Sequence, residues 1–179
     1  MAKKILQSEH KVLRDIATEV SVADITTPAI KKVLKEMSAS LKSQNDGVAI
    51  AAPQIGYSLR IFVVAGKIFS PEFADENRDT KDVVNAQDIK DLVFINPVIT
   101  KLSKEKEWVP EGCLSVRPLY GKTHRSKKAT VTAYDEHGNK FTRGGAGLLA
   151  QIFQHEIDHL NGILFIDHAK DVKAEELPE

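Results

Sequence analysis

The sequence predicts an α+β fold, with mostly antiparallel strands packed around a central helix near the C-terminal end. Three observations predict it. An amphipathic helical pattern comes early in the chain, strand-like segments occupy its middle, and an apolar segment of helical length follows them. With 179 residues, a single domain is expected. A chain of this size can bury roughly 70% of the surface that it exposes when unfolded, which allows a sizeable core.

The first predicted helix begins at Thr26-Thr27-Pro28, where a capping hydroxyl precedes a proline in the first turn. The helical pattern ends near Asn45-Asp46-Gly47. Its apolar residues recur at helical spacing and are Ile30, Val33, Leu34, Met37 and Leu41. Such a stripe indicates packing against a core, and it carries no functional meaning by itself.

Two strands are predicted next, at residues 59–64 and 92–99, where apolar and β-branched residues dominate. Residues 66–91 lie largely between these strands and are polar, rich in charge and only weakly periodic. We expect this interval to be a surface insertion within the one domain of residues 1–179.

A hairpin and a final helix are predicted in the last third of the chain. Residues 129–134 alternate between apolar and polar, turn residues follow, and residues 140–143 can return as the partner strand. Glycines at 144–147 then lead into an apolar segment, 148–160, of helical length. Asn161-Gly162 should close this helix, because both residue types tolerate a left-handed backbone.

The composition limits the classes of partner. Lysine plus arginine and aspartate plus glutamate each number 25, so the net charge is zero and no overall field recruits nucleic acid or an anionic membrane. No stretch is apolar enough to span a bilayer, and the N-terminal residues lack the apolar region of a secretory signal. A cytoplasmic location is therefore expected. The single cysteine excludes an internal disulfide.

Among the polar residues of the largely apolar final helix, three can act together on a cation and a water: His155, Glu156 and His159. Burying a neutral polar group without a partner costs roughly 2–7 kcal/mol, so these residues need compensation. The spacing H-E-x-x-H places the two imidazoles one turn apart, where they can converge on one cation, with the glutamate beside them to act on water. The alternative is a chance match, in which the histidines bond to backbone or carboxylate groups.

A third ligand would decide the chemistry. In the long zinc-protease pattern a histidine would stand at the position of Phe165, so that pattern fails. The remaining candidate is Cys113, in the stretch EGCLS, and its alternative is a small buried hydrophobe. A further stretch, GVAIAAPQIG at 47–56, contains Gln54, whose amide could donate to a developing oxyanion. By itself that stretch is equally compatible with a tightly packed turn.

Taken together and in this order along the chain, the stretches 47–56, 111–115 and 154–162 closely resemble the three signature motifs of peptide deformylases, and the resemblance covers nearly the whole chain. It implies a metal-dependent enzyme that removes the formyl group from the N-terminal formylmethionine of nascent polypeptides and releases formate. It also implies that Cys113, His155 and His159 hold one divalent ion, typically Fe2+, whose ligands can also take Zn2+, Ni2+ or Co2+.

The resemblance assigns roles to further residues. Glu156 would accept a proton from water and deliver it to the departing amine, while the Leu114 backbone N–H and the Gln54 side chain would meet the oxyanion. Asp158 would pair with Arg125, which would otherwise belong to a solvated basic run. The positions that match the family's substrate-binding residues are Gly47, Val48, Ala49, Glu111, Gly112, Leu148, Gln151 and Ile152. Of these, Val48, Leu148 and Ile152 would line an apolar pocket for the methionine side chain.

The chain departs from the family pattern at three places. Ala49 stands where a second glycine is usual, and its methyl group is expected to crowd a substrate backbone bound in extended form. Val116-Arg117-Pro118 replaces the usual Val-Pro-Gly, which leaves specificity beyond methionine open. The acidic tail KAEELPE gives no basis for a ribosome contact through a basic C-terminal helix.

The expected partners are the formylated N-termini of nascent peptides, together with a transient ribosome contact, and neither direct nucleic-acid readout nor a membrane is expected. Two alternatives remain at the level of the sequence. One is a metallopeptidase or amidase that acts on unformylated peptides. The other is a relative that only binds peptide N-termini, although Glu156 argues against it, because a pure binding site needs no general base.

Overall fold

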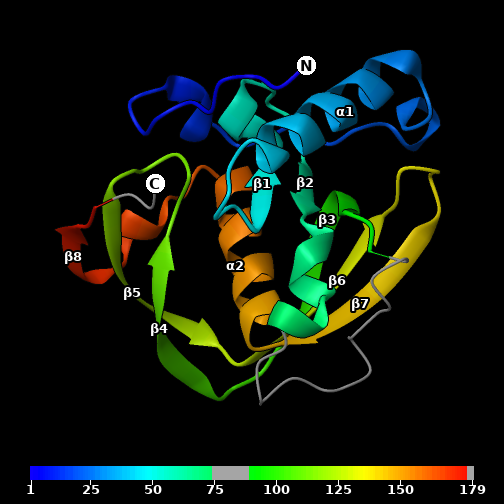
Figure 1. Ribbon diagram of the computed structural model, residues 1–179. Coiled ribbons are helices and arrows are strands. Elements are labelled where there is room, and N and C mark those ends of the chain that lie inside the picture. The colour runs from blue at the N-terminus through cyan, green and yellow to red at the C-terminus, as the bar shows by residue number, and fades with distance from the viewer. Residues whose placement is uncertain (74–88, 177–179) are drawn as a thin grey trace.

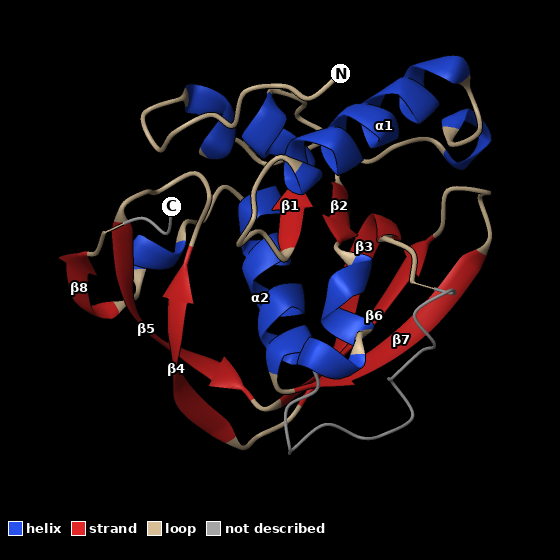
Figure 2. Cartoon of the chain, viewed as in Figure 1, coloured by secondary structure: helices blue, strands red, loops and turns tan. Residues whose placement is uncertain are grey.

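Two antiparallel sheets flank a central helix, α2 (Leu148–Leu160), in the computed structural model, which describes residues 1–73 and 89–176 (Figure 1). A second helix, α1 (Pro28–Lys42), lies across one end of the larger sheet. The strands are β1 (Ala49–Ala51), β2 (Ile61–Val64), β3 (Leu92–Leu102), β4 (Lys106–Gly112), β5 (Leu119–Ser126), β6 (Lys128–Tyr134), β7 (Lys140–Ala146) and β8 (Lys170–Ala174). Short 3-10 helices, drawn with the helices in Figure 2, are η1 (Lys11–Leu13), η2 (Val22–Asp24), η3 (Ala52–Ile55), η4 (Gly66–Phe69), η5 (Pro71–Phe73) and η8 (Phe165–Asp167).

The larger sheet has the strand order β1-β2-β3-β6-β7 and contains all the strands that the sequence predicts. The segments predicted at 59–64 and 92–99 form β2 and β3, which pair with each other in antiparallel register. The predicted hairpin is β6 and β7, which pair from Tyr134 with Lys140 to Lys128 with Ala146. The α+β prediction, with mostly antiparallel strands and a C-terminal helix, is confirmed.

The smaller sheet, of order β4-β5-β8, is not predicted from the sequence. Two of its strands lack the alternation of buried and exposed residues that marks a half-buried strand: every residue of β8 is exposed, and β4 is exposed or half-buried except at Glu111. β5 does alternate, but its buried residues are glycine or polar, so no apolar pattern marks this strand in the sequence. The turn from β4 to β5 nevertheless matters for function, because Cys113 directly follows β4.

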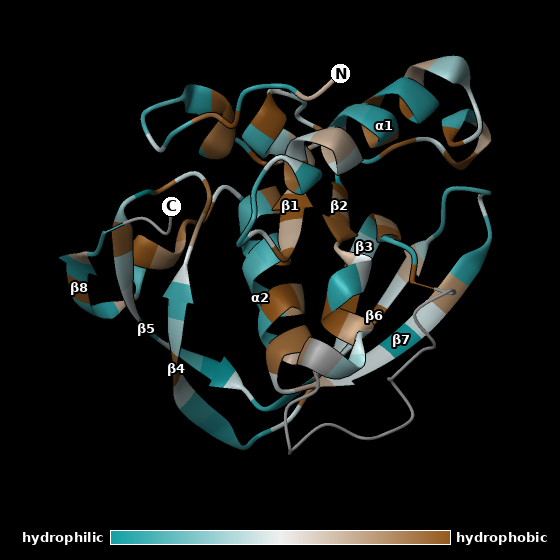
Figure 3. Ribbon diagram, in the orientation of Figure 1, coloured by the Kyte–Doolittle hydropathy of each residue, from teal (hydrophilic) through white to brown (hydrophobic). Residues whose placement is uncertain are grey.

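The main hydrophobic core lies between the larger sheet and α2. Phe62 of β2 stacks on Phe94 of β3 with ring centroids 4.5 Å apart, and Phe153 of α2 meets Phe94 edge-on at 5.3 Å. Figure 3 shows hydrophobic residues along β2 and α2 and hydrophilic residues on β8. Helix α2 is therefore held by apolar packing, which fixes the position of the polar residues that it carries.

Helix α1 begins and ends close to the predicted limits, but its predicted capping interaction is wrong. The Thr27 hydroxyl makes no capping hydrogen bond to the helix, and donates instead to the backbone carbonyl of Asp24 at 2.6 Å. The predicted apolar stripe is largely buried, with Met37 and Leu41 almost inaccessible to solvent. A second core cluster lies between α1 and the larger sheet, and α1 therefore has the packing role expected of it.

The first residues of the predicted surface insertion at 66–91 do not lie on the surface. Gly66, Ile68 and Phe69, in η4, are buried, and the side chains of Ile68 and Phe69 belong to the main core. Residues 74–88 of this interval lie outside the described residues. Within the described ranges, every helix is too short or too polar to cross a bilayer.

Candidate metal centre

Helix α2 carries His155, Glu156 and His159 in the interior of the molecule. Two features fix the position of this helix. Gly162, with φ of 74°, closes the helix in the predicted left-handed conformation. The Gln154 side chain pins the helix to β5, since its oxygen accepts from the backbone N–H of Ser126 at 2.9 Å and its nitrogen donates to the Ser126 carbonyl at 2.9 Å. Both bonds are buried, so they fix the register between helix and sheet.

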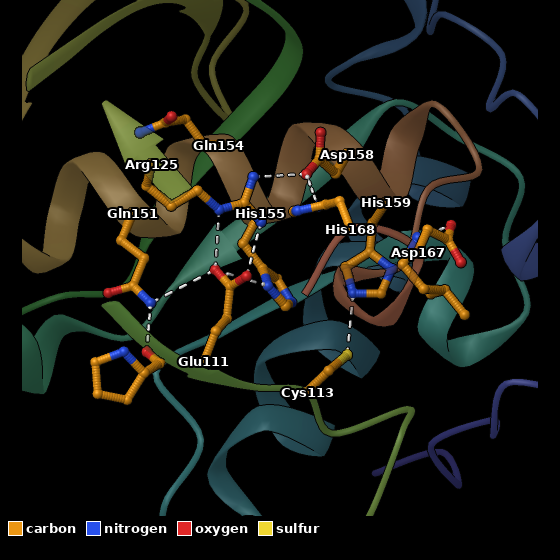
Figure 4. A network of polar contacts seen from close by, with 12 residues as sticks. Glu111, Cys113, Arg125, Gln151, Gln154, His155, Asp158, His159, Asp167 and His168 are labelled. Carbon is orange, nitrogen blue, oxygen red and sulfur yellow. Dashed lines mark hydrogen bonds and ion pairs between the residues drawn. The ribbon is translucent and has the colours of Figure 1, made fainter. Parts of the chain in front are cut away.

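Cys113 reaches the same place from the end of β4. Its Sγ lies 3.2 Å from Nε2 of His159, and the candidate ligand atoms of Cys113, His155 and His159 all lie within 4.8 Å of one another. Figure 4 shows the thiol and the two imidazoles turned toward each other from the β4–β5 connection and from α2. The structure thus brings together the two histidines and the cysteine that are separated by more than 40 positions in the sequence.

A buried ionic network supports His155. Arg125 donates to Glu111 through Nε at 3.2 Å and through Nη2 at 2.8 Å, and its Nη1 donates to Asp158 at 2.7 Å. Oε1 of Glu111 also lies 3.4 Å from Nδ1 of His155 (Figure 4). His155 therefore directs one ring nitrogen at a carboxylate and keeps Nε2 for a ligand.

The structure bears on two expectations about this network. Arg125 is buried and contacts the half-buried Asp158, which is the pair that the family resemblance implies. Glu111 was expected among substrate-binding residues, yet its carboxylate is buried and engaged by Arg125 and His155. The carboxylate therefore supports His155, and the part of Glu111 in substrate binding stays a prediction.

The charges of the site follow from burial and from these contacts. Burial by itself raises the pKa of Glu111, but contacts with His155 and Arg125 outweigh it and lower the pKa to about 2. Burial raises the pKa of Glu156 to about 7. Burial opposes the charged form of His155, but hydrogen bonds to Cys113 and Glu111 raise its pKa well above the usual value, whereas burial and the nearby His155 lower the pKa of His159.

The residues present fit a transition-metal ion. Two buried polar atoms of this centre, Oε2 of Glu156 and Nδ1 of His159, have no hydrogen-bond partner among the described residues. Such atoms are costly unless water or an ion completes the site. A thiolate and two imidazoles are the donors that zinc and similar divalent ions favour, and three protein ligands leave a further position open.

Gln54 and Leu114 stand beside this centre. Gln54 is buried in η3, its oxygen accepts from the Ala51 N–H at 2.8 Å, and its amide nitrogen lies 3.7 Å from Cys113 Sγ. That nitrogen also donates to the Ser115 hydroxyl at 3.1 Å. The backbone N–H of Leu114 has no acceptor within residues 1–73 and 89–176. The Leu114 N–H and the Gln54 amide, which donates to Cys113 Sγ and to Ser115, therefore both lie close to the thiol.

A cavity of about 230 Å³ opens onto the centre and is lined by all three sequence motifs. Among the predicted substrate-binding residues, Gly47 does not line it, and those that do are Val48, Ala49, Glu111, Gly112, Leu148, Gln151 and Ile152. Sequence reasoning missed Asp46, Pro110 and Tyr120, which also line the cavity, and noted Arg117 only as part of a departure from the family pattern. No sequence signal points to Tyr120: its ring packs so closely on Gly112 that a Cβ there would collide with it, a contact that only the fold creates.

Comparison with known proteins agrees with the three motifs. A family model described as polypeptide deformylase matches residues 2–175. The chain is 41% identical over 165 residues to peptide deformylase 2 of Clostridium acetobutylicum, covering 92% of this chain and 93% of that protein. It is 39% identical to the peptide deformylase of a Synechocystis species, over 92% of this chain and 77% of that protein.

Solved structures show the same likeness in three dimensions. A peptide deformylase from Legionella pneumophila is 33% identical and superposes with a TM-score of 0.77, covering 96% of this chain and 88% of that one. A class I type b peptide deformylase from Acinetobacter baumannii, solved with Met-Ala-Ser bound, is 30% identical with a TM-score of 0.78, covering 94% and 98% of the two chains. The likeness therefore spans the fold as well as the motifs.

Proposed function

The chain belongs to the peptide deformylase family and is an enzyme that removes the N-terminal formyl group from nascent polypeptides, and on that premise we propose that Cys113, His155 and His159 hold the divalent ion of the reaction. The observation that carries the proposal is the convergence of their ligand atoms within 4.8 Å, beside a cavity that Cys113 and His155 line. The network through Glu111 and Arg125 supports the assignment, because it orients His155 as a neighbouring carboxylate orients a ligating histidine.

The native ion is proposed to be Fe2+, with Zn2+, Ni2+ or Co2+ able to replace it. One sulfur and two nitrogen donors can bind each of these ions. The ions differ in how tightly such a site binds them, and not in the type of ligand that they require. When bound, the ion supplies Lewis acidity, which can lower the pKa of a coordinated water from about 15.7 to about 7.

Glu156 is proposed as the general base and then the general acid. Its carboxylate is buried beside His155, and a pKa of about 7 suits a group that takes up and gives back a proton near neutrality. It would take a proton from the attacking water and deliver it to the amine that leaves when the formyl C–N bond breaks. Its unpartnered Oε2 is the atom available for this transfer.

The developing oxyanion would be stabilised by the Leu114 N–H and by the Gln54 amide. The Leu114 N–H lacks an acceptor in the described residues, and the Gln54 amide is held in place by the Ala51 N–H. Donors that are already oriented before the reaction stabilise charge at little further cost, and removing one typically lowers kcat by about 10²–10³.

The substrate is proposed to lie in the cavity beside these groups. Val48, Leu148 and Ile152 offer an apolar wall for the methionine side chain, with Gln151 at its edge. Gln151 is fixed there because it donates to the Pro110 carbonyl at 2.8 Å. β1 pairs only with β2 in the described residues, so an extended peptide can run beside its other edge.

The wider setting of the reaction is also proposed. Residues 1–179 would form one catalytic domain, because strands from both halves of the sequence share the larger sheet. The substrate is a nascent polypeptide, so the enzyme would work in the cytoplasm and contact the ribosome transiently. No nucleic-acid readout and no membrane are needed for this role.

The test is anaerobic purification, followed by metal analysis and a formate-release assay on a formyl-methionyl peptide. The wild-type protein should contain about one ion per chain and release formate. Cys113→Ala should lose the ion and the activity, whereas Glu156→Ala should keep the ion and lose the activity, because Glu156 is no ligand. Activity that survives either substitution would overturn the assignment.

A further inference from the structure

Two charged residues that the proposed reaction does not use face each other at the cavity. Asp46 precedes β1, and Arg117 lies in the connection between β4 and β5, so they belong to the two segments that also supply Gln54 and Cys113. Both line the cavity, and Nη2 of Arg117 lies 2.6 Å from Oδ1 of Asp46. Their side chains are 20% and 35% exposed, so the ion pair borders the space that a bound peptide would occupy.

The ion pair leaves most of the hydrogen-bonding capacity of Arg117 unused. A guanidinium has five N–H donors. Of these, only one nitrogen of Arg117 has a partner in the part of the chain that the structure describes. Arg125 shows in the same molecule that one guanidinium can bind two carboxylates, those of Glu111 and Asp158. Arg117 therefore has room for a second anionic partner.

The substrate can supply that partner. With the formyl group at the metal centre and methionine against Val48, Leu148 and Ile152, the residues after methionine must leave past the rest of the lining. Arg117 is the arginine of the lining, and its other guanidinium N–H groups have no partner among the described residues. A carboxylate suits it better than a carbonyl does, because a guanidinium binds a carboxylate through two parallel hydrogen bonds.

We infer that Arg117 is a specificity-determining residue, which favours substrates with aspartate or glutamate at the second or third position after the formylated end. Asp46 holds the guanidinium in place when no acidic substrate is bound. When an acidic substrate binds, Asp46 competes with the substrate carboxylate for Arg117. This inference rests on the proposed placement of the metal centre and the substrate in the cavity. It assigns a role to a segment, Val116-Arg117-Pro118, in which the chain departs from the usual family sequence.

The test compares kcat/KM for C-terminally amidated formyl-methionyl tripeptides that differ only in aspartate or asparagine, placed at position two or at position three. Aspartate and asparagine have nearly the same shape, so the ratio of the two rates reports charge alone. At one of the two positions, we expect kcat/KM for the aspartate peptide to exceed that for the asparagine peptide about threefold to fivefold, the size of effect typical of a partly exposed ion pair. The ratio should be smaller in about 0.5 M sodium chloride, because salt screens the interaction. Arg117→Gln should bring the ratio to one, and Asp46→Asn should raise it above the wild-type ratio.

Arg14→Gln is the matched control. It also removes an arginine–aspartate pair, in which Nη1 lies 2.6 Å from Oδ2 of Asp167, but Arg14 does not line the cavity, so this variant should keep the wild-type ratio. Arg117→Lys, which keeps the charge and loses the planar donors, should give an intermediate ratio. A wild-type ratio of one, or a ratio that Arg117→Gln leaves unchanged, would overturn the inference. Formate release from the asparagine peptides would still show that the deformylase assignment holds.

Discussion

Ala49 is the residue at which packing and catalysis compete most directly. Its methyl group belongs to the main core cluster and is only 6% exposed, yet the residue also lines the cavity. Glycine is the usual residue at this position of the family motif. The methyl group therefore fills core space at the same point where it narrows the path of an extended substrate.

We expect Ala49→Gly to raise kcat/KM for formyl-methionyl peptides and to lower the free energy of unfolding by about 0.5–1 kcal/mol, because glycine in a strand has more freedom to lose on folding. Steady-state kinetics and thermal denaturation measure the two effects. Ala51→Gly is the matched control, since Ala51 lies on the same face of β1 and is buried but does not line the cavity. It should lose stability without a gain in rate. If Ala49→Gly also brings no gain, the cavity already accommodates the methyl group.

The sequence is informative about single residues where a motif requires them and silent where folding creates the contact. The pairing of Arg125 with Asp158 could be predicted, because Arg125 matches an arginine of the family that the motifs resemble. The second partner of Arg125 could not: Glu111 stands on the neighbouring strand, four positions beyond the residue directly opposite Arg125. Register alone would not place these two side chains in contact, so the pair becomes visible only in the folded structure.

Strand β5 and helix α2 are joined by the buried contacts of Arg125. We expect Arg125→Ala to lower the free energy of unfolding by about 3–5 kcal/mol and to weaken metal retention, because it leaves the buried Glu111 carboxylate unpaired. Denaturation by urea and metal analysis after dialysis measure these losses. Lys127→Ala removes a nearby but exposed pair with Glu105, and should cost at most about 1 kcal/mol. Equal losses in the two variants would contradict the role of Arg125.

The same network predicts how the metal-free protein responds to acid. The pKa of Glu111 is lowered from 4.5 to about 2 in the folded protein, so its ionised form stabilises the fold above about pH 4.5. This stability, on the order of 3 kcal/mol, should be lost progressively as the pH falls toward about 2.

Urea denaturation between about pH 6 and about pH 3 tests the acid response. Glu111→Gln should be less stable than the wild type near neutrality and should show a flatter decline with acid. Glu105→Gln is the control, because Glu105 forms an exposed pair with Lys127 and contributes little. Parallel pH profiles for the wild type and Glu111→Gln would show that Glu111 does not carry the effect.

At the level of elements, α2 could be predicted from end to end, and the smaller sheet could not. An apolar run between glycines gives a helix of definite length, and Leu148–Leu160 has the predicted ends. β8 offers no such pattern, because all five of its residues are exposed and it is held by backbone pairing with β5. A strand that buries neither face has no alternation of apolar and polar residues by which it could be recognised in the sequence.

At the scale of the whole molecule, the candidate metal centre joins the part built on the larger sheet to the part built on the smaller sheet. His155 and His159 belong to a helix that packs on the larger sheet, while Cys113 directly follows a strand of the smaller one. An ion that binds only the folded protein stabilises it by mass action, by about 2.7 kcal/mol when its free concentration is 100 times the Kd.

We therefore expect a chelator to lower the Tm of the wild-type protein, and added Zn2+ or Co2+ to restore it. His159→Ala should have the lower Tm from the start and should not respond to chelator. Glu156→Ala should respond as the wild type does, because it removes the proposed base and leaves the ligands intact. Differential scanning fluorimetry with and without chelator measures all three, and a chelator-sensitive His159→Ala variant would exclude His159 as a ligand.

Because Cys113 is the only cysteine in the chain, the protein carries its own reporter of metal occupancy. A thiolate that ligates an ion reacts slowly with alkylating reagents, and no second thiol contributes a background signal. The single cysteine also makes the enzyme sensitive to oxidation. Oxidation of its sulfur atom removes a ligand, and no second cysteine is present to form a disulfide that could later be reduced. Loss of thiol titre and loss of turnover should then follow a single time course.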